Sequence, residues 1–474
     1  MTLPEEFVRR MKALMGIKYP AFARALTETA AVRALRVNTV KTSESRFQEL
    51  CTLSLSGSGV QGCYIFNEDK IGADPLHFAG AYYVQDPSAA AAVAAAAEYI
   101  RPDMLALDMC ASPGGKSTQL AAYLENGALV SNEIVPQRCR ILRGNIERLG
   151  IKNAAVTCLE PSQLAVLCPG LFDFVLCDAP CSGEGMFRKY EEALLNWTPA
   201  NVEMCAARQA DILDSAAATV APGGYLLYST CTFSVEENEM NVDSFLRRHP
   251  DFYLARPAES IVNITADGID FPGCRNDMSF CRRFYPHLSP GEGQFIAIMR
   301  RNSDIAVTSA KSRRSVGTNT SKQADRNRLS VLKGAEARAC AEFLESIIEK
   351  SERSTAVRRL RNDIMLLPEP MTRLPDGLPA VLWGICAGTV TPSGRVEPHH
   401  HLFSASGSHM TNRLSLSLDD PRLRAYLRGE TVECDCNMRS WCAILAEEVA
   451  LGGGKAVCGT MKNHYPKGLR LRDA

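Results

Sequence analysis

The chain has 474 residues, 46% of them hydrophobic and 22% charged, with a formal net charge of zero at pH 7. This is an ordinary composition for a soluble protein of two to four domains. It excludes a chain that is basic overall, so any basic surface that binds a nucleic acid must be local.

Two features of the sequence bear on the compartment. Residues 1–6 contain acids and no apolar signal segment, and the bland stretch at residues 89–97 is too short to span a bilayer. The 18 cysteines of such a chain are expected to be reduced thiols. Cysteines 434, 436, 442 and 458 lack the paired C-x-x-C spacing of common zinc sites, so no metal is predicted. We expect a cytoplasmic protein that has no contact with a membrane.

Residues 1–80 mix short helical and strand signals. Within them, residues 34–39 alternate apolar and polar side chains, which predicts a half-exposed strand. The pattern then changes, because residues 81–301 repeat the order strand, turn, helix. Strands are predicted at 105–109, 128–131, 154–159, 172–177, 224–229 and 295–299, and helices at 116–125 and 136–149. This alternation is typical of an α/β domain with a parallel sheet covered on both faces.

Three further features complete the predicted organisation. Residues 234–237 match a capping box and predict the start of a helix after Cys231. In residues 302–334, Lys, Arg, Ser, Thr and Asn dominate, which suits either a solvated linker or a basic arm that touches phosphates. Another domain is predicted from residue 335 to residue 474, beginning with a helix over 335–349.

A glycine-rich turn over residues 108–117 joins the first predicted strand of the α/β domain to its helix. Glycines let a ligand approach the backbone, and the helix N-terminus offers free N–H groups. The end of this turn, residues 115–117, matches a phosphate-binding loop, but the first glycine of that motif would fall at Cys110. The turn is therefore predicted to hold a cofactor without a triphosphate, with a purely structural turn as the alternative.

Two acids follow the next two predicted strands. Glu133 lies about 25 residues after Asp108, where an acid can accept hydrogen bonds from both hydroxyls of a ribose. Together with the glycine-rich turn, this suits an adenosine cofactor, and S-adenosylmethionine fits that description. Glu160 ends the third strand, where its side chain could reach an adenine amino group; a solvated loop acid is equally consistent.

Cysteines follow two further strands. Residues 178–181 read Asp-Ala-Pro-Cys after one strand, and residues 229–231 read Ser-Thr-Cys after the other. Ligands bind beyond the carboxyl ends of the strands in an open parallel sheet, so both thiols are expected in one crevice. Methylases of exocyclic amines commonly carry an aromatic ring where this chain has Cys181, which favours chemistry that uses sulfur.

At these residues the chain resembles the RsmB/RsmF/NOP class of RNA 5-methylcytosine methyltransferases. The similar segments are residues 83–88, 108–117, 145–150, 178–183, 229–238 and 291–295. The ending over residues 462–470 is similar to the RsmF branch, whose members act on small-subunit ribosomal RNA. The resemblance implies a class I (Rossmann-like) methyltransferase domain over 81–301, an N-terminal RNA-binding domain over 1–80, a basic linker over 302–334 and a PUA-like RNA-binding region over 335–474.

The resemblance also implies a role for each site residue. Cys231 is the expected nucleophile, Cys181 is expected to help release the product, and Asp178 is expected between the cofactor and the target base. Glu133 is expected to bind the ribose of S-adenosylmethionine, and Glu160 its adenine. The methionine end of the cofactor is expected against Cys110, Ala111, Ser112, Pro113, Gly114, Gly115 and Lys116.

Methylation of carbon 5 of cytosine explains why thiols are needed. Carbon 5 is a poor nucleophile, but a thiolate that adds at carbon 6 turns the ring into an enamine that can attack a sulfonium methyl. A free cysteine has a pKa of about 8.5, so the site must lower it or take the proton during addition. A protonated or strongly hydrogen-bonded Asp178 would stabilise the charge that addition creates. The reverse assignment, with Cys181 as attacker, stays open, because DNA cytosine methylases use a thiol in a Pro-Cys motif.

The expected partner is small-subunit ribosomal RNA, free or in a 30S particle, bound by a monomer. The alternatives are a tRNA or DNA substrate, and a non-catalytic ribosome-assembly factor. The target base must leave its stack to enter the crevice. The candidates for RNA binding are Arg33, Arg36 and Asn38 near the N-terminus and Lys462, Lys467, Arg470 and Arg472 in the tail.

Overall fold

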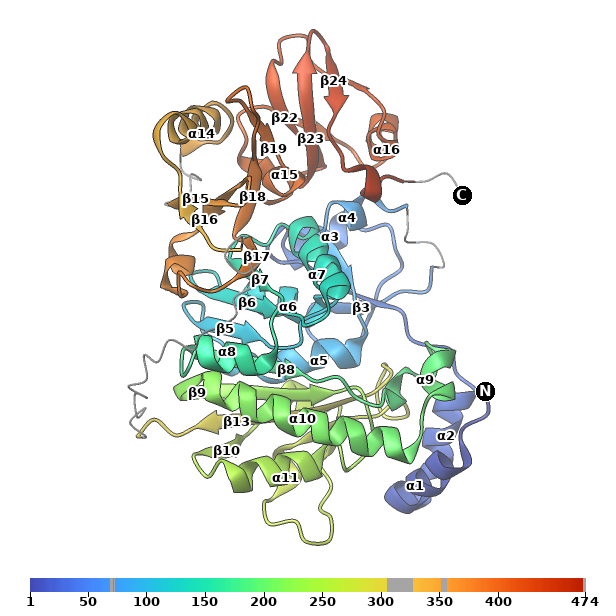
Figure 1. Ribbon diagram of the computed structural model, residues 1–474. Helices are drawn as coiled ribbons and strands as arrows, with labels where there is room; N and C mark the ends of the chain where they lie inside the picture. The colour runs from blue at the N-terminus through green and yellow to red at the C-terminus, as the bar shows by residue number, and fades with distance from the viewer. Residues whose placement is uncertain (69–70, 72, 305–326, 351–355, 472–474) are drawn as a thin grey trace.

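The computed structural model describes residues 1–68, 71, 73–304, 327–350 and 356–471 (Figure 1). Most of the predicted linker, residues 305–326, lies outside the described residues. Within the described part, the strands form four sheets, one with ten strands and three smaller ones. No helix in the described part is long and apolar enough to cross a membrane.

The ten-stranded sheet has the order β11-β12-β13-β9-β8-β5-β6-β7-β17, and β10 also pairs with β13. Its parallel strands are β5 (Leu105–Asp108), β6 (Ala128–Asn132), β7 (Ala154–Thr157), β8 (Phe172–Asp178) and β9 (Val220–Thr230). Its antiparallel strands are β10 (Phe252–Ala255), β11 (Ala266–Asp267), β12 (Arg282–Phe284), β13 (Gln294–Arg301) and β17 (Ala380–Trp383). The α/β class is thus confirmed for the central strands, whereas both edges of the sheet are antiparallel.

Helices cover this sheet because its central strands are apolar runs buried on both faces. Helix α5 packs against α6, and α10 packs against α8 and α11. The helices of this domain are α5 (Pro87–Ala95), α6 (Gly115–Tyr123), α7 (Pro136–Arg148), α8 (Pro161–Leu167), α9 (Glu191–Leu195), α10 (Pro199–Thr219), α11 (Glu239–Arg248) and α12 (Glu259–Val262). The predicted helices at 116–125 and 136–149 correspond to α6 and α7.

The N-terminal part has a four-stranded sheet of order β2-β3-β1-β4. Its elements are α1 (Glu5–Met15), α2 (Tyr19–Thr27), β1 (Ala34–Val37), α3 (Glu44–Leu50), β2 (Ser56–Gly57), β3 (Cys63–Ile65), α4 (Pro75–Phe78) and β4 (Tyr82–Val84). The strand predicted at 34–39 is present, but the prediction that it is half-exposed is wrong. All four residues of β1 are buried, because Arg36 points at α6 rather than at solvent.

The C-terminal part, orange to red in Figure 1, contains two five-stranded sheets. One has β14 (Ser330–Val331), β15 (Ala356–Leu360), β16 (Asp363–Leu367), β18 (Ile385–Val390) and β19 (Val396–Pro398), next to helix α14 (Gly334–Ile347). The other has β20 (Arg413–Leu416), β21 (Val432–Glu433), β22 (Ser440–Ala446), β23 (Val449–Val457) and β24 (Thr460–Asn463). Helices α15 (His400–Ser406) and α16 (Pro421–Arg428) complete it.

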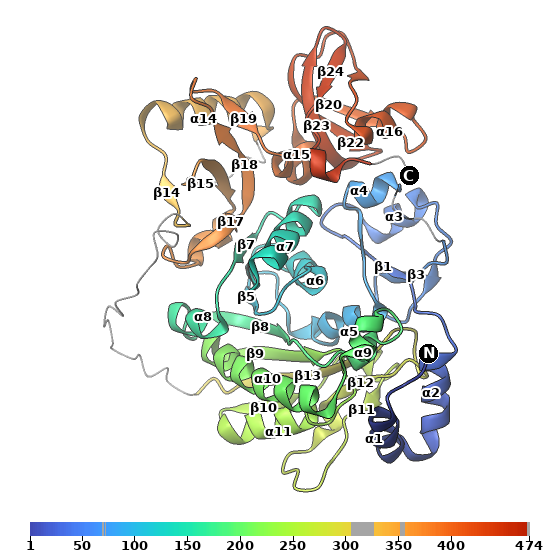
Figure 2. The same ribbon diagram turned by 45° about the vertical axis from the view of Figure 1, so that its right-hand side comes forward.

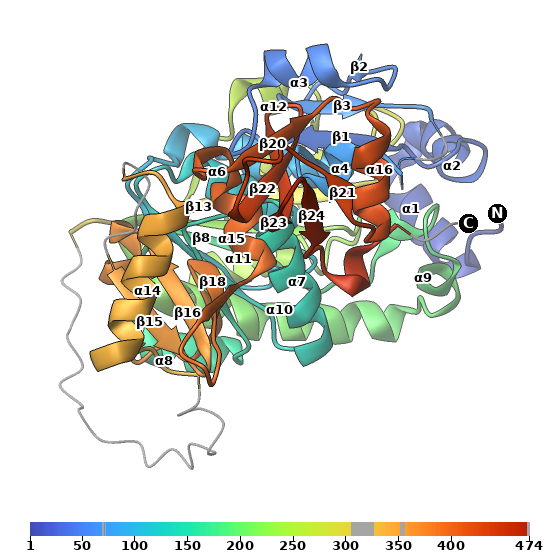
Figure 3. The ribbon, with the colours of Figure 1, turned by 90° about the horizontal axis from the view of Figure 1, so that it is seen from above.

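Strand β17 comes from this C-terminal part but belongs to the central sheet. It pairs antiparallel with β7, and it lies beside that strand in Figure 2. Helix α15 adds a second link, because His401 Nε2 bonds to the carbonyl oxygen of Ile151 at 3.1 Å. In Figure 3, which is seen from above, the red C-terminal sheet lies over α7. Helix α15 contacts α7 directly. The α/β domain and the region beyond residue 334 therefore share a sheet. The predicted boundary between them stays a prediction.

The capping-box prediction at residues 234–237 is wrong. These residues form a turn, and α11 begins only at Glu239. The reason is that Glu237 turns inward: its Oε2 accepts a hydrogen bond of 2.9 Å from the N–H of Ser182. A side chain used in that contact cannot close a cap at Ser234.

The acid that ends β5 is buried in the middle of the domain. Asp108 is 1% exposed, and its Oδ2 accepts a hydrogen bond of 2.6 Å from Ser117 Oγ on α6. Burial raises the pKa of Asp108 to about 7, although the bond from Ser117 opposes this rise. The unfolded chain would have an ordinary aspartate pKa of about 3.9. From about pH 4 to pH 7 the folded chain thus keeps a proton that the unfolded chain loses, and stability falls as the pH rises.

The substitution Asp108→Asn is expected to remove this contribution. As the pH rises from 5 to 8, the free energy of unfolding, measured by urea titration, should change in favour of the variant relative to the parent chain. The exposed Asp419 offers a matched control, because Asp419→Asn makes the same substitution without removing a buried carboxyl group. Equal pH dependence of the Asp108→Asn variant and the parent would contradict the assignment.

Candidate functional site

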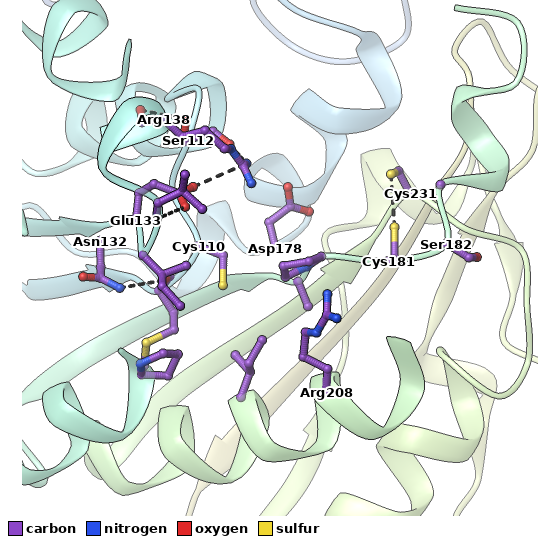
Figure 4. A pocket seen from close by; sticks show the side chains of 18 of the residues that line it. Cys110, Ser112, Asn132, Glu133, Arg138, Asp178, Cys181, Ser182, Arg208 and Cys231 are labelled. Carbon is purple, nitrogen blue, oxygen red and sulfur yellow. Dashed lines mark hydrogen bonds and ion pairs between the residues drawn. The ribbon is translucent and has the colours of Figure 1, made fainter. Parts of the chain in front are cut away.

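A cavity of about 940 Å³ opens beyond the carboxyl ends of the parallel strands (Figure 4). Its wall includes residues from the glycine-rich turn, from the end of β6, from the segments that follow β6, β7, β8 and β9, and from α9 and α10. This volume lies within the range of natural ligand pockets. The crevice that strand topology predicts is therefore present, and it reaches from the turn to both cysteines.

The glycine-rich turn is held in shape from two sides. Gly114 has φ +114°, a conformation that residues with a side chain rarely adopt, and a Cβ on Gly115 would lie 3.2 Å from the ring of Tyr83. On the other side, Arg138 of α7 donates a bond of 3.0 Å to the carbonyl oxygen of Ser112. Cys110 and Ser112 form part of the cavity wall, whereas Ala111, Pro113, Gly114, Gly115 and Lys116 do not.

The two predicted acids both reach the cavity wall. Glu133 is 3% exposed; its Oε1 accepts a bond of 2.9 Å from the N–H of Val135, and its Oε2 lies 3.4 Å from Arg138. Arg138 and Glu133 face each other in Figure 4. Glu160 is exposed at the N-terminus of α8, where its N–H donates to Gln163 Oε1 at 3.0 Å. The structure thus brings both acids to the same side of the cavity, one buried and one at its rim.

Asp178, the last residue of β8, accepts three hydrogen bonds. Lys116 Nζ lies 2.8 Å from its Oδ2, while Ser229 Oγ and Gln294 Nε2 lie 2.7 Å and 3.1 Å from its Oδ1. Burial lowers the pKa of Lys116, but the charge of Asp178 and their hydrogen bond outweigh this effect and raise it overall. All three partners donate, so Asp178 is a strongly hydrogen-bonded acceptor. Ser229 and Gln294 were not predicted as site residues, although both lie in segments that carry the resemblance.

The two cysteines lie opposite each other. Strands β8 and β9 are parallel neighbours with Asp178 in register with Ser229, so the loops after them leave the sheet together. Cys181 Sγ and Cys231 Sγ are 3.2 Å apart, and Figure 4 shows them facing each other at one end of the cavity. A hydrogen bond with Cys231, together with burial, raises the pKa of the Cys181 thiol well above its usual value. All 18 cysteines of the chain are free thiols.

One wall of the cavity carries residues that the sequence did not predict. Arg208 on α10 is exposed and points toward Asp178 and the cysteine pair in Figure 4. Tyr190, just before α9, is 62% exposed and lies on the same wall. An exposed arginine and an exposed aromatic ring are the side chains that bind phosphates and stack on bases. No local sequence pattern marks them, because only the packing of α9 and α10 brings them to the cavity.

Two of the residues predicted to bind RNA have other tasks. Arg36 is 4% exposed and donates to Gln85 Oε1 at 2.8 Å and to Thr118 Oγ1 at 2.9 Å. Asn38 is 1% exposed and donates to the carbonyl oxygens of Gly80 and Leu149. These predictions are wrong, because both side chains fasten the N-terminal sheet to the α/β domain. Arg33, Lys462, Lys467 and Arg470 remain candidates, and Arg472 lies outside the described residues.

The donors around the cavity suit an organic ligand. In the described part of the chain, no group of three or more His, Cys, Asp or Glu side chains is arranged to hold a metal ion. What the cavity does offer is a backbone turn ahead of a helix, a buried carboxylate, and two thiols at the far end.

Family models match three parts of the chain. Residues 99–300 match the model described as 16S rRNA methyltransferase RsmB/F. Residues 3–87 match the N-terminal domain of 16S rRNA methyltransferase RsmF, and residues 413–471 match the RsmF PUA domain. The chain thus carries a match at its N-terminal part, at its central sheet and at its last sheet.

Similar proteins agree with these matches. The ribosomal RNA small subunit methyltransferase F of Cronobacter sakazakii is 29% identical over 99% of this chain and 97% of its own. The protein of that name from Erwinia tasmaniensis is 33% identical over 64% of each chain, which is just under two thirds of its length. Among solved structures, a methyltransferase homologue from Pyrococcus horikoshii is 26% identical, with a TM-score of 0.54 over 63% of this chain and 95% of its own.

A second solved structure, NSun6 from Pyrococcus horikoshii with SFG, shares the fold. It is 24% identical, with a TM-score of 0.53 over 63% of this chain and 98% of its own. The fold, the cavity and the three family matches lead to one conclusion. The chain belongs to the RsmB/RsmF family of 16S rRNA methyltransferases.

Proposed function

We propose that this protein transfers a methyl group from S-adenosylmethionine to carbon 5 of a cytosine in 16S ribosomal RNA. The observation that carries the proposal is the pair of thiols, 3.2 Å apart, in the cavity that also contains Asp178 and the glycine-rich turn. Family membership and the names of the relatives support the substrate class. We expect the protein to act as a monomer in the cytoplasm.

The cavity has the features that S-adenosylmethionine requires. Cys110 and Ser112 of the turn line the cavity just ahead of the N-terminus of α6, while Gly114 and Gly115 let the turn pack closely against Leu142 and Tyr83 behind it. Glu133 is placed to accept hydrogen bonds from the ribose hydroxyls, and Glu160 at the rim is placed near the adenine. When bound, the cofactor supplies an electrophilic methyl group. Cys110 and Ser112 would lie against its methionine end, and Asp178 beyond it.

Cys231 is the proposed nucleophile. Its thiolate adds to carbon 6 of the flipped cytosine, and the electrons of the carbon 5–carbon 6 double bond move into the ring toward nitrogen 3. Nitrogen 3 takes a proton from water in the cavity as this charge reaches it, and gives the proton back when the aromatic ring is restored. Asp178, as a carboxylate held by three donors, accepts a hydrogen bond from that N–H group and stabilises it. Carbon 5 then becomes nucleophilic enough to accept a methyl group.

Cys181 is proposed to act in release. After methylation, carbon 5 carries both the methyl group and a proton, and this proton must leave to water in the cavity. The electrons of the carbon–hydrogen bond then restore the double bond, and the bond from carbon 6 to Cys231 breaks. The thiol of Cys181, 3.2 Å away, donates a hydrogen bond to the departing thiolate.

The wall with Arg208 and Tyr190 is proposed as the entrance for RNA. When a base enters the cavity, its flanking phosphates come to lie at the rim. There Arg208 can bind them, and Tyr190 can stack on a neighbouring base. The PUA-like region adds a second RNA-binding surface. An assembly factor without catalysis would have no use for the combination of Asp178, Cys181 and Cys231.

Methylation itself is tested with ribosomal RNA from a strain that lacks the protein. Bisulfite sequencing of its 16S RNA should show at least one cytosine that has lost its protection from bisulfite conversion. Purified protein with S-adenosylmethionine should restore this protection on naked RNA or on 30S particles. The variant Cys231→Ala is the matched control and should restore nothing. If protection is unchanged in 16S RNA and lost in tRNA, the tRNA alternative holds instead.

The unequal roles of the thiols are tested by trapping. Cys181→Ala is expected to accumulate a covalent RNA–protein adduct that survives denaturing electrophoresis, because Cys231 still attacks but leaves slowly. Cys231→Ala should form no adduct. Adducts with Cys231→Ala, together with an adduct-free and inactive Cys181→Ala, would reverse the two roles.

The entrance is tested with Arg208→Gln. Loss of one phosphate contact should raise KM for RNA, leave the Kd for S-adenosylmethionine unchanged, and reduce the slope of log affinity against log salt by about one. Arg256→Gln is the control, because Arg256 is exposed and pairs with Glu259 away from the cavity. An unchanged salt slope in Arg208→Gln would exclude a phosphate contact.

A further inference from the structure

A buried carboxylate lies directly behind the loop that carries Cys181. Glu237 is fully buried; its Oε2 accepts bonds from the N–H of Ser182 at 2.9 Å and from Gln209 Nε2 at 2.8 Å. Its Oε1 accepts a further bond from Ser182 Oγ. Burial raises the pKa of Glu237, and the hydrogen bonds from Ser182 and Gln209 oppose this rise. Its side-chain oxygens only accept hydrogen bonds, and three donors favour the ionised carboxylate against the effect of burial.

This carboxylate connects the two cysteine loops. Ser182 follows Cys181, and its hydroxyl lies 2.9 Å from Thr232 Oγ1, the residue after Cys231. Gln209 also bonds to the carbonyl oxygen of Pro180 at 2.9 Å. Figure 4 shows the Ser182 side chain turned away from the sulfur pair, so the network fixes the loop from behind. Moving Glu237 would therefore move Cys181.

The charges on the two sides of the sulfur pair differ in sign. The charge of Glu237 acts on Cys181, whereas Lys116 interacts electrostatically with Cys231. A shared proton between two sulfurs is drawn toward the anion and away from the cation. The other titratable or charged groups around them are Asp178 on β8, Glu184 in η3 (Glu184–Met186), Tyr228 on β9, and Cys205 and Arg208 on α10.

We propose that Glu237 is a positioning residue that makes the two thiols unequal: it keeps the proton on Cys181 and leaves Cys231 as the thiolate. This inference rests on the proposed function and explains why the attacker follows β9 rather than β8. Glu184, the second buried acid of the cluster, does not compete for this task. Burial and the charge of Glu237 raise the pKa of Glu184 to about 7. Glu184 lies on the same loop as Cys181, and its oxygens accept from Trp197 Nε1 and from the N–H of Phe233 rather than from Ser182.

The test measures thiol reactivity without RNA. The purified full-length chain is treated with iodoacetamide from pH 6 to pH 10, and mass spectrometry of the two peptides gives the alkylation rate of each cysteine. In the parent, Cys231 should react with a lower pH midpoint than Cys181. In Glu237→Gln, the pH midpoint for alkylation of Cys181 should fall by about one pH unit or more. The gap between the midpoints of Cys181 and Cys231 should therefore narrow.

Glu184→Gln is the matched control, because it makes the same substitution in an equally buried acid of the same cluster and should leave the gap in place. Faster alkylation of Cys181 than of Cys231 in the parent would overturn the proposal without any variant. An unchanged gap in Glu237→Gln, or an equal narrowing in Glu184→Gln, would also overturn it.

A second readout connects reactivity with the reaction. In the presence of S-adenosylmethionine, methylation of 5-fluorocytosine in RNA leaves a methyl group and fluorine on carbon 5. No proton can then leave that carbon, so the bond from carbon 6 to whichever cysteine attacked is retained. Peptide mapping should find the adduct on Cys231 in the parent, and adducts on both cysteines in Glu237→Gln. Adducts on Cys231 alone in Glu237→Gln would exclude a role of Glu237 in selecting the attacker. If no RNA is ever methylated but the alkylation gap closes as described, the proposed function fails while the assignment of Glu237 holds.

Discussion

The carboxylate of Asp178 is the contact on which the site depends. It accepts hydrogen bonds from α6 through Lys116, from β9 through Ser229 and from β13 through Gln294. One side chain therefore connects the glycine-rich turn, the strand that leads to Cys231 and β13, the antiparallel strand that pairs with β9. Because the group is charged and partly buried, each donor that is lost leaves it poorly compensated. Substitution of Asp178 would therefore disturb α6, β9 and β13 together.

Behind Asp178, polar networks rather than apolar packing fix the reactive loops. Arg36 holds the first turn of α6 from the N-terminal sheet, and Arg138 holds Ser112 from α7. Glu237 and Gln209 hold the loop of Cys181. Hydrogen bonds are directional, so such networks set the position of a sulfur or a carboxylate more narrowly than apolar contacts can. Two chemically identical thiols can thereby be given different surroundings within a few ångströms.

The sequence predicted what strand topology controls. Apolar runs that end in Asp108, Asp178 and Ser229 were enough to place both cysteines and the glycine-rich turn in one crevice. It failed where partners are far apart along the chain. Glu237 matched a local cap, but its true partner, Ser182, is 55 residues away. Arg36 looked like a surface cation, but its partner, Thr118, is 82 residues away. Local periodicity carries no record of such pairings.

Strand β17 gives the chain a particular order of assembly during synthesis. A ribosome makes β7 (Ala154–Thr157) long before β17 (Ala380–Trp383), so the outer edge of β7 has no partner strand while the intervening residues are translated. An unpaired edge of this kind is a template for pairing with other chains. The central sheet is complete only when part of the C-terminal region has emerged, so a truncated translation product would expose the edge that the complete chain covers.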